Sequence, residues 1–202
     1  ELDIAIDVTR QAISELAKIP HDEVCFNYAE TLPREMKAEI DNSLEKIILK
    51  RLLPTGIPVL SEEKGVTGDI GDNELRWVVD PLDGTVNFIR NMAPCSVSIA
   101  LCIGETPILG VIGEYPSQKI AWGGEIFGSF LNNKKLRVSN IKDKSKAVIC
   151  TGFPSRYEFS ETNKEQFFSK ISPFGKVRMF GAASLSLLQV AKGATDAYFE
   201  NE

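Results

Sequence analysis

A single apolar run that ends in two aspartates constrains this chain more than any other feature. Residues 75–79 are mostly apolar and typical of a buried strand, and Pro81 has no amide hydrogen with which to continue a strand's hydrogen bonds. The pattern therefore predicts a turn with Asp80 and Asp83 at the strand's exit. The two carboxylates and the backbone carbonyl of Leu82 would then face one small volume, and oxygen ligands of this kind suit Mg²⁺.

Gly84 and Thr85 follow directly, and a helix that begins here would aim free backbone N–H groups at an anion. The sequence thus indicates metal-assisted phosphate chemistry. A plain turn is the simpler interpretation, because Asp-Pro and Asp-Gly are common turn dipeptides. However, a second apolar run, residues 59–61, also ends in carboxylates, Glu62 and Glu63. Three carboxylates at strand ends would repel one another unless a cation neutralises them, which favours the metal site.

Residues 80–88, Asp-Pro-Leu-Asp-Gly-Thr-Val-Asn-Phe, and the upstream pair Glu62-Glu63 resemble the inositol monophosphatase family of Mg²⁺-dependent phosphomonoesterases. The resemblance covers most of residues 35–202. It continues through four later segments, 96–111, 128–139, 178–184 and 193–200. It implies a layered α-β-α-β-α sandwich of the inositol monophosphatase and sugar phosphatase type, with α+β and α/β parts and with its last part missing.

The resemblance also implies a metal site and a reaction. The ligands would be the carboxylates of Glu62, Asp80 and Asp83, together with the Leu82 carbonyl. One Mg²⁺ would bind the phosphate oxygens and prepare the attacking water, and another would neutralise the leaving oxygen. The implied function is hydrolysis of a small polyol or sugar phosphate by direct in-line attack of water, without a phosphoenzyme.

The resemblance also implies which residues contact the phosphate and the attacking water. Backbone N–H groups of Gly84 and Thr85 would bind the phosphate. The Thr85 hydroxyl would orient the water, with Asp41 on an early helix as its partner. The family usually carries Val-Thr before this aspartate, whereas residues 37–40 here are Lys-Ala-Glu-Ile. Without the resemblance, Asp41 and Glu45, one helical turn apart, would be interpreted as a solvated charged face.

The substrate's hydroxyl groups would contact Asp83, Ala183 and Glu200, as the resemblance implies. Taken alone, these C-terminal residues allow structural interpretations. Ser184 could be a helix N-cap, and Asp196 and Glu200, on one face of a strand, could simply be solvated. The role of Asp196 therefore stays open.

The substrate itself also stays open, because relatives use inositol phosphates, sugar bisphosphates, histidinol phosphate or phosphonucleotides. Members that cleave phosphoadenosine phosphate usually carry Lys-Glu where this chain has Val86-Asn87, which favours the inositol or sugar-phosphate branch. Two other hypotheses remain. The chain could be a catalytically impaired regulator or binding protein that retains the fold, or a structural domain in which Asp80 and Asp83 only form turns.

The family follows its Ala-Tyr-Phe-Glu strand by a Trp-Asp pair whose aspartate completes the second metal site. This sequence ends at Glu202, before that position. We therefore expect it to be part of a longer protein. In a protein that ended here, the second metal site would be incomplete and the regulatory hypothesis would be favoured.

Composition and charge narrow the classes of partner. A net charge of −5 argues against a nucleic-acid-binding protein, and the longest apolar runs are too short for a membrane span. Four cysteines without C-x-x-C spacing predict reduced thiols and a cytoplasmic location. The lone histidine, His21, excludes a multi-histidine zinc site. The expected partner is a small phosphorylated metabolite, and the resemblance is compatible with a homodimer.

The polar segment 139–146 divides the chain into two predicted halves. Residues 1–138 would form an α+β metal-binding half and residues 139–202 an incomplete α/β substrate-side half of one family domain. Helices are expected before Pro20 and at 34–53, 161–172 and 184–192. Strands are expected at 57–60, 75–80, 95–103, 107–115, 118–123, 127–131, 147–151, 176–180 and 195–199, with 20–34 irregular.

Overall fold

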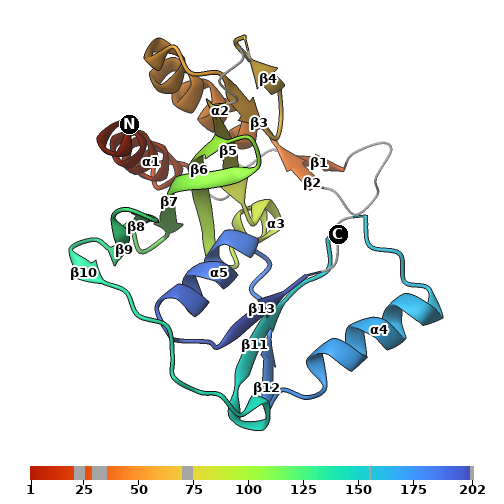
Figure 1. Cartoon of the computed structure of the whole chain (residues 1–202). Helices are drawn as coiled ribbons and strands as arrows, with labels where there is room; N and C mark the ends of the chain where they lie inside the picture. The colour runs from red at the N-terminus through yellow and green to blue at the C-terminus, as the bar shows by residue number, and fades with distance from the viewer. Residues whose placement is uncertain (21–25, 29–35, 70–74, 155, 201–202) are drawn as a thin grey trace.

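The computed structural model describes residues 1–20, 26–28, 36–69, 75–154 and 156–200 (Figure 1). For residues 26–28 and 36–38 it describes the backbone alone. His21, Cys25 and Arg34, on which some of the sequence predictions depend, lie outside the described residues.

The elements form five layers, in the order helix, sheet, helix, sheet, helix (Figure 1). Helices α1 (Leu2–Leu16) and α2 (Glu39–Leu52) pack on the larger sheet, and α5 (Ala183–Ala191) lies between this sheet and the smaller one. Helix α4 (Glu161–Ile171) covers the smaller sheet's outer face. The predicted layered α-β-α-β-α sandwich is therefore confirmed. Among the described helices, none has both the length and the apolar character needed to cross a bilayer.

The larger sheet has eight strands in the order β10-β9-β8-β7-β6-β5-β3-β4. Among the described strands of this sheet, only β3 and β5 pair in parallel, so that the carboxyl ends of these two strands meet at one edge. The Glu62 backbone N–H, just past β3, donates to the Val79 carbonyl at 3.3 Å. The strands are β3 (Val59–Ser61), β4 (Gly65–Thr67), β5 (Leu75–Asp83), β6 (Cys95–Ile103), β7 (Thr106–Tyr115), β8 (Lys119–Gly124), β9 (Gly128–Leu131) and β10 (Lys134–Lys135).

The main core lies between α1, α2 and the larger sheet. The buried face of α1 repeats every three or four residues, as expected for an amphipathic helix. Trp77, Val97 and Ile99 of the sheet are fully buried against the two helices. The side chains that form the buried face of α1 are Ala5, Val8, Thr9, Ala12, Ile13 and Leu16.

The smaller sheet contains three parallel strands, β12 (Lys176–Arg178), β11 (Val148–Thr151) and β13 (Ala197–Phe199), in that order. Phe167 and Ile171 of α4 pack on Ile149 of β11. Residue 139, where the predicted halves meet, lies in the connection between the last strand of the larger sheet and the first of the smaller sheet.

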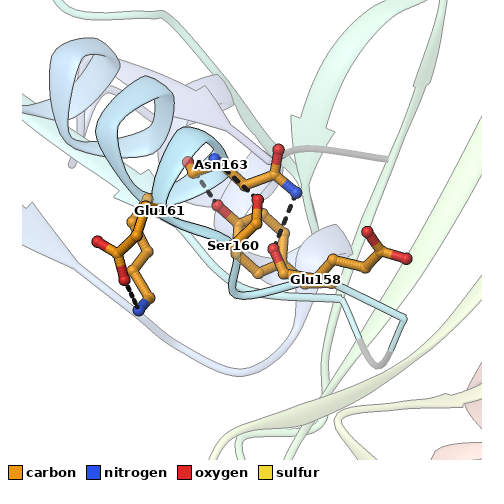
Figure 2. Close-up of polar contacts among 6 residues, drawn as sticks. Glu158, Ser160, Glu161 and Asn163 are labelled. Carbon is orange, nitrogen blue, oxygen red and sulfur yellow. Dashed lines mark hydrogen bonds and ion pairs between the residues drawn. The ribbon is translucent and has the colours of Figure 1, made fainter.

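Helix α4 begins in a small network of polar contacts (Figure 2). The Ser160 hydroxyl accepts a hydrogen bond from the Asn163 backbone N–H at 3.2 Å, so Ser160 is the N-cap. The Asn163 side-chain amide donates to the Glu158 carbonyl at 2.9 Å, and Glu161 pairs with Lys164 at 2.8 Å. The bonds of Asn163 to Ser160 and Glu158 fix the start of α4 to the segment that precedes it, whereas the Glu161–Lys164 pair lies within the helix.

The N-terminal third differs from the prediction at the start of α2 and by the additional strands β1 (Phe26–Tyr28), β2 (Met36–Ala38) and β4. The helix predicted from residue 34 begins only at Glu39, because β2 pairs antiparallel with β1. Strand β1 itself lies in the stretch predicted to be irregular. Backbone pairing with the preceding strand β1 therefore overrides the helical spacing of the apolar residues at this end.

Candidate active site

The candidate site begins at a bulge in β5. This strand continues to Asp83, beyond its predicted end at Asp80, but its pairing with β6 shifts between these two residues. Asp80 lies opposite Ser98 and Asp83 opposite Ser96, so that two residues of β5, 81–82, face one residue of β6. The predicted turn is thus a bulge after which pairing resumes. Such a bulge suits a proline and re-aims the neighbouring side chains.

Thr85 is the first residue of the short helix α3 (Thr85–Ile89). Its hydroxyl donates toward two acceptors, the Leu82 carbonyl oxygen at 2.9 Å and Asp41 Oδ1 at 3.3 Å. Asp41 comes from the first turn of α2 and is only 5% exposed. Asp41 and Glu45 are both buried, so the solvated-face interpretation of this part of α2 is wrong.

The Asp83 carboxylate binds the beginning of α5. It accepts hydrogen bonds from the backbone N–H groups of Ala183 at 3.1 Å and Ser184 at 2.7 Å, and from the Ser184 hydroxyl at 2.6 Å. A carboxylate offers about four acceptor positions, so these bonds leave roughly one for a metal ion or substrate. The helix's N-cap is Ala182, so the alternative interpretation of Ser184 as the N-cap is wrong.

Gly84 joins the bulge to α3 in a left-handed conformation with φ of +90°. A Cβ atom at this position would lie 3.3 Å from Ala182 Cβ and from the Gly181 carbonyl oxygen, a tight contact, and the positive φ itself disfavours any residue with a side chain. The Asn87 side-chain amide donates to the Phe180 carbonyl at 2.7 Å. The motif of residues 80–88 therefore packs against, and hydrogen-bonds to, residues 180–182, which lead into α5.

Four carboxylates share one region, and we call Asp41, Glu62, Asp80 and Asp83 the acidic cluster. Burial is the main cause that raises the pKa of Asp80 to about 8. Negative charge on Asp83, Glu62 and Asp41 raises this pKa further, and a hydrogen bond from the Leu82 backbone N–H opposes the shift. The acidic cluster therefore places like charges close enough to disfavour ionisation of its central member.

The same surroundings affect a neighbouring thiol. Burial, followed by the charges of Asp83 and Asp41, raises the pKa of Cys95 to about 12. Since the thiolate is the nucleophilic form, Cys95 is not a nucleophile near neutral pH.

The acidic cluster fits a divalent cation in its chemistry. Carboxylate and carbonyl oxygens are the ligands that Mg²⁺ takes, and a bound cation would relieve the repulsion that acts on Asp80. Within the described residues, no three carboxylate, histidine or cysteine side chains already form a metal cage. The Asp83 carboxylate is largely taken up by the backbone N–H groups of α5, which leaves it about one free acceptor position.

Glu45 supports this site, although its role was not foreseen from the sequence. Its side chain is fully buried, and Oε1 accepts a hydrogen bond from the Lys64 backbone N–H at 3.1 Å. The Lys64 ammonium lies 3.7 Å from Oε2. This contact fixes the turn after β3 that carries Glu62. A glutamate one helical turn after Asp41 was the only signal in the sequence.

A cavity of about 170 Å³ lies beside the acidic cluster, and we call it the substrate-side cavity. Asp83, Ala183, Phe153 and Glu200 are among the residues that line it. The Tyr198 hydroxyl donates a hydrogen bond to the Glu200 carboxylate. Burial and this bond raise the pKa of Tyr198, so its phenol stays protonated and able to donate. The structure thus brings Glu200 to the same cavity as Asp83 and Ala183.

Asp196, whose role the sequence left open, has a structural position. Its carboxylate accepts hydrogen bonds from the Ser139 hydroxyl and from the Val148 backbone N–H, the latter at 2.6 Å. These bonds lower the pKa of Asp196, and they tie the connection between the two sheets to β11.

Comparison with known proteins identifies relatives of this chain. A sequence model described as "Inositol monophosphatase family" matches residues 2–202. A fructose-1,6-bisphosphatase/inositol-1-monophosphatase of Aquifex aeolicus is 34% identical over 149 residues, which are 71% of this chain and 54% of that protein. A Nus factor SuhB of Xylella fastidiosa is 34% identical over 167 residues, which are 81% of this chain and 59% of that protein.

Solved structures share the fold. The extragenic suppressor protein suhB from Bartonella henselae has a TM-score of 0.87 and 27% sequence identity, and the match covers 99% of this chain and 78% of that one. The chain spans less than two thirds of the length of the two curated relatives above. Because the family model matches the chain from its second residue to its last, this chain belongs to the inositol monophosphatase family.

Proposed function

We propose that the protein is an Mg²⁺-dependent phosphomonoesterase that hydrolyses a small polyol or sugar phosphate. One observation carries the proposal: the Thr85 hydroxyl lies between the Leu82 carbonyl and the buried Asp41 carboxylate, beside the acidic cluster. This arrangement can hold a water molecule next to a cation site. The name of the Aquifex aeolicus relative, a fructose-1,6-bisphosphatase/inositol-1-monophosphatase, supports the same class of substrate.

Thr85 and Asp41 would position the attacking water. The Thr85 hydroxyl donates its hydrogen bond to a fixed acceptor, Asp41, so its oxygen keeps a lone pair that can accept a hydrogen bond from water. Asp41 is held in the first turn of α2 and is almost fully buried, which limits the positions that this water can take. Positioning of this kind lowers the barrier because less freedom is lost on reaching the transition state.

Glu62, Asp80 and the Leu82 carbonyl would hold Mg²⁺, with the remaining acceptor position of Asp83. Bound Mg²⁺ would neutralise charge on the phosphate and make a nearby water more acidic. The pKa of about 8 for Asp80 means that this carboxyl group must give up its proton when the cation binds near neutral pH.

On the substrate's side, backbone N–H groups of Gly84 and Thr85 would bind the phosphate. Glu200 and Asp83 would accept hydrogen bonds from hydroxyl groups of a polyol in the substrate-side cavity. The Ala183 N–H already donates to Asp83 at 3.1 Å, so a substrate that uses this N–H must compete with Asp83 for it.

The proposal is tested by phosphate release from the complete gene product, with and without Mg²⁺. The substrates would be myo-inositol 1-phosphate, fructose 1,6-bisphosphate, histidinol phosphate and phosphoadenosine phosphate. We expect Mg²⁺-dependent release, faster from the first two than from the last. A folded protein that releases no phosphate from any of them above background would contradict the proposal.

A binding or regulatory role is the second candidate. It is favoured by the Xylella fastidiosa relative, which is named a Nus factor. In this role the fold and the acidic cluster would be retained without turnover. The same experiment separates the two candidates, because only the phosphatase releases phosphate.

A further inference from the structure

A second cavity lies near the C-terminal end of α5 and is lined by positively charged side chains, whereas the acidic cluster lies near the helix's N-terminal end. Lys134, Lys135, Arg137 and Lys192 line this space of about 550 Å³, and we call it the basic cavity. We propose that the basic cavity binds a compact polyanion, a small molecule that carries two or more phosphate groups. The inference does not rest on the proposed phosphatase activity.

Separate parts of the chain bring the four cations together. Lys134 and Lys135 form β10, Arg137 follows in the connection, and Lys192 comes directly after α5. Gly193 has a φ of +71°, and a Cβ atom there would lie 2.8 Å from the Arg137 carbonyl oxygen. The end of α5 and the connection are thus packed backbone against backbone, which only glycine permits. The walls of the basic cavity are held by the fold.

Two hydrogen bonds anchor the same wall. The Leu136 backbone N–H donates to the Ser129 carbonyl at 2.8 Å, which ties the exit of β10 to β9. Three residues later, the Ser139 hydroxyl donates to Asp196 near β13. The connection that carries Arg137 is therefore fixed on both sides of that residue.

The positive charge of the basic cavity has no acidic partner among the described residues. In the part of the chain that the structure describes, none of these four cations makes an ion pair or a side-chain hydrogen bond. Six of the chain's 23 lysines and arginines lie between residues 134 and 146, with Asp143 as the one acidic residue, although the whole chain has a net charge of −5. Like charges around one cavity repel each other, and an anion relieves that repulsion.

The observations favour a compact polyanion over a nucleic acid. Two phosphate groups carry a charge of about −3 to −4 near neutral pH, which matches four cations. The cations converge on one concave space of a size typical of small-molecule sites. None of the described side chains that line it is aromatic, whereas proteins that hold single-stranded nucleic acid stack its bases on aromatic rings.

The basic cavity is separate from the candidate active site. The first residues of α5 bind Asp83, and Lys192 lies just past the helix's other end. Nine helical residues span about 13 Å. In Figure 1, α5 extends from its end near α3 toward the strand β10. One ligand could occupy each end of the helix without contact between them.

The test uses inorganic tripolyphosphate as the probe, titrated calorimetrically into the complete protein with a chelator present. Without a metal ion, the acidic cluster repels anions, so the signal reports on the basic cavity. The variant Lys135→Gln/Arg137→Gln removes two cations of the cavity. Its matched control, Lys142→Gln/Lys146→Gln, removes the same charge from exposed positions further along the connection. Thermal unfolding checks that each variant is folded.

We expect one tripolyphosphate per chain, affinity reduced roughly tenfold or more in the cavity variant, and little change in the control. Absence of binding to the unmodified protein would overturn the proposal. Equal loss of tripolyphosphate affinity in both variants would also overturn the proposal, since it would show that binding depends only on the protein's overall charge. A third titration uses a single-stranded oligouridylate. If this RNA bound more tightly than tripolyphosphate and either variant weakened its binding, the proposed ligand would be a nucleic acid and the compact polyanion would be ruled out.

Discussion

The Asp83 carboxylate is bound twice by Ser184, through the serine's backbone N–H at 2.7 Å and its hydroxyl at 2.6 Å. This contact joins the bulge of β5 to the first turn of α5, 101 residues later. An ionised carboxylate is also favoured at a helix N-terminus by the helix dipole. The residue expected to bind metal therefore also holds in place the helix that borders the substrate-side cavity.

Replacing Ser184 with alanine should lower the stability of the protein. Ser184→Ala removes a charge-assisted hydrogen bond to Asp83 and a hydrogen bond with the buried Ser96 hydroxyl at 2.8 Å, which should reduce the free energy of unfolding by about 1 to 2 kcal/mol. For a chain of this size the melting temperature should fall by roughly 2–8 °C. Calorimetry would measure the change. Ser169→Ala, which removes a hydroxyl bonded to a backbone carbonyl at an exposed position of α4, should have little effect. Equal melting temperatures for both variants would contradict the importance of the Asp83–Ser184 contact.

Removal of the Thr85 hydroxyl should slow catalysis without unfolding the protein. Thr85→Val keeps the shape of the side chain but removes the group that contacts Asp41 and Leu82. We expect kcat to fall by about 10² or more, because the attacking water loses its orientation. Thr85→Ser retains the hydroxyl and should keep most of the activity. Steady-state kinetics would show the difference, and similar kcat values for the valine and serine variants would rule out this role.

The free energy of unfolding of the metal-free protein should fall as pH rises. The pKa of Asp80 is about 8 in the folded protein, against about 3.9 in an unfolded chain. Between these values the folded state binds more protons than the unfolded state, so this group's contribution to stability decreases with increasing pH. Denaturant unfolding between pH 5 and pH 8, with a chelator, should show the decline.

Asp80→Asn should flatten this pH dependence, because asparagine does not titrate. Added Mg²⁺ should restore stability at pH 8 in the unmodified protein but not in the variant. If the variant and the unmodified protein lost stability in parallel between pH 5 and pH 8, the acidic cluster would not be the cause.

Loss of the Tyr198 hydroxyl should weaken the binding of substrates that carry polyol hydroxyl groups and leave other phosphate esters unaffected. Tyr198→Phe removes the donor that orients Glu200. We expect KM for a polyol phosphate to rise by about five- to tenfold with a smaller change in kcat. Hydrolysis of p-nitrophenyl phosphate, which has no polyol hydroxyls, should be unaffected. Tyr157→Phe, which removes a hydroxyl bonded near the start of α4, is the matched control. Similar KM changes for both substrates would contradict the positioning role.

The acidic cluster could be anticipated from the sequence because much of it is local. The apolar run, Pro81 and the spacing of Asp80 and Asp83 together require an interruption of the strand just where these carboxylates lie. The upstream pair at Glu62 reaches the same edge because β3 and β5 are parallel neighbours. Most strands and helices of the core also lie within two or three residues of their expected positions, since burial imposes a clear period on each.

The contacts that depend on distant partners could not be anticipated. Serine is a common N-cap residue, yet the Ser184 hydroxyl binds the carboxylate of Asp83, 101 residues earlier. Glu45 has the character of a surface residue on α2, and only the fold shows that it is buried against Lys64. Lys192 joins the basic cavity for the same reason, because the end of α5 packs against the connection after β10. In each case the side chain's role depends on long-range packing.

The central claim is that the acidic cluster binds Mg²⁺ and thereby supports hydrolysis of a phosphate ester. The most direct measurement is phosphate release from myo-inositol 1-phosphate as a function of Mg²⁺ concentration. It would compare the unmodified protein, Asp80→Asn, and Glu105→Gln at an exposed turn. We expect saturable Mg²⁺ dependence in the unmodified protein and the turn variant. Loss of an outer partner of a metal costs about 10–100-fold, so loss of the ligand itself in Asp80→Asn should cost at least that much. Release that needs no Mg²⁺, or that is equal in a folded Asp80→Asn protein, would contradict the claim.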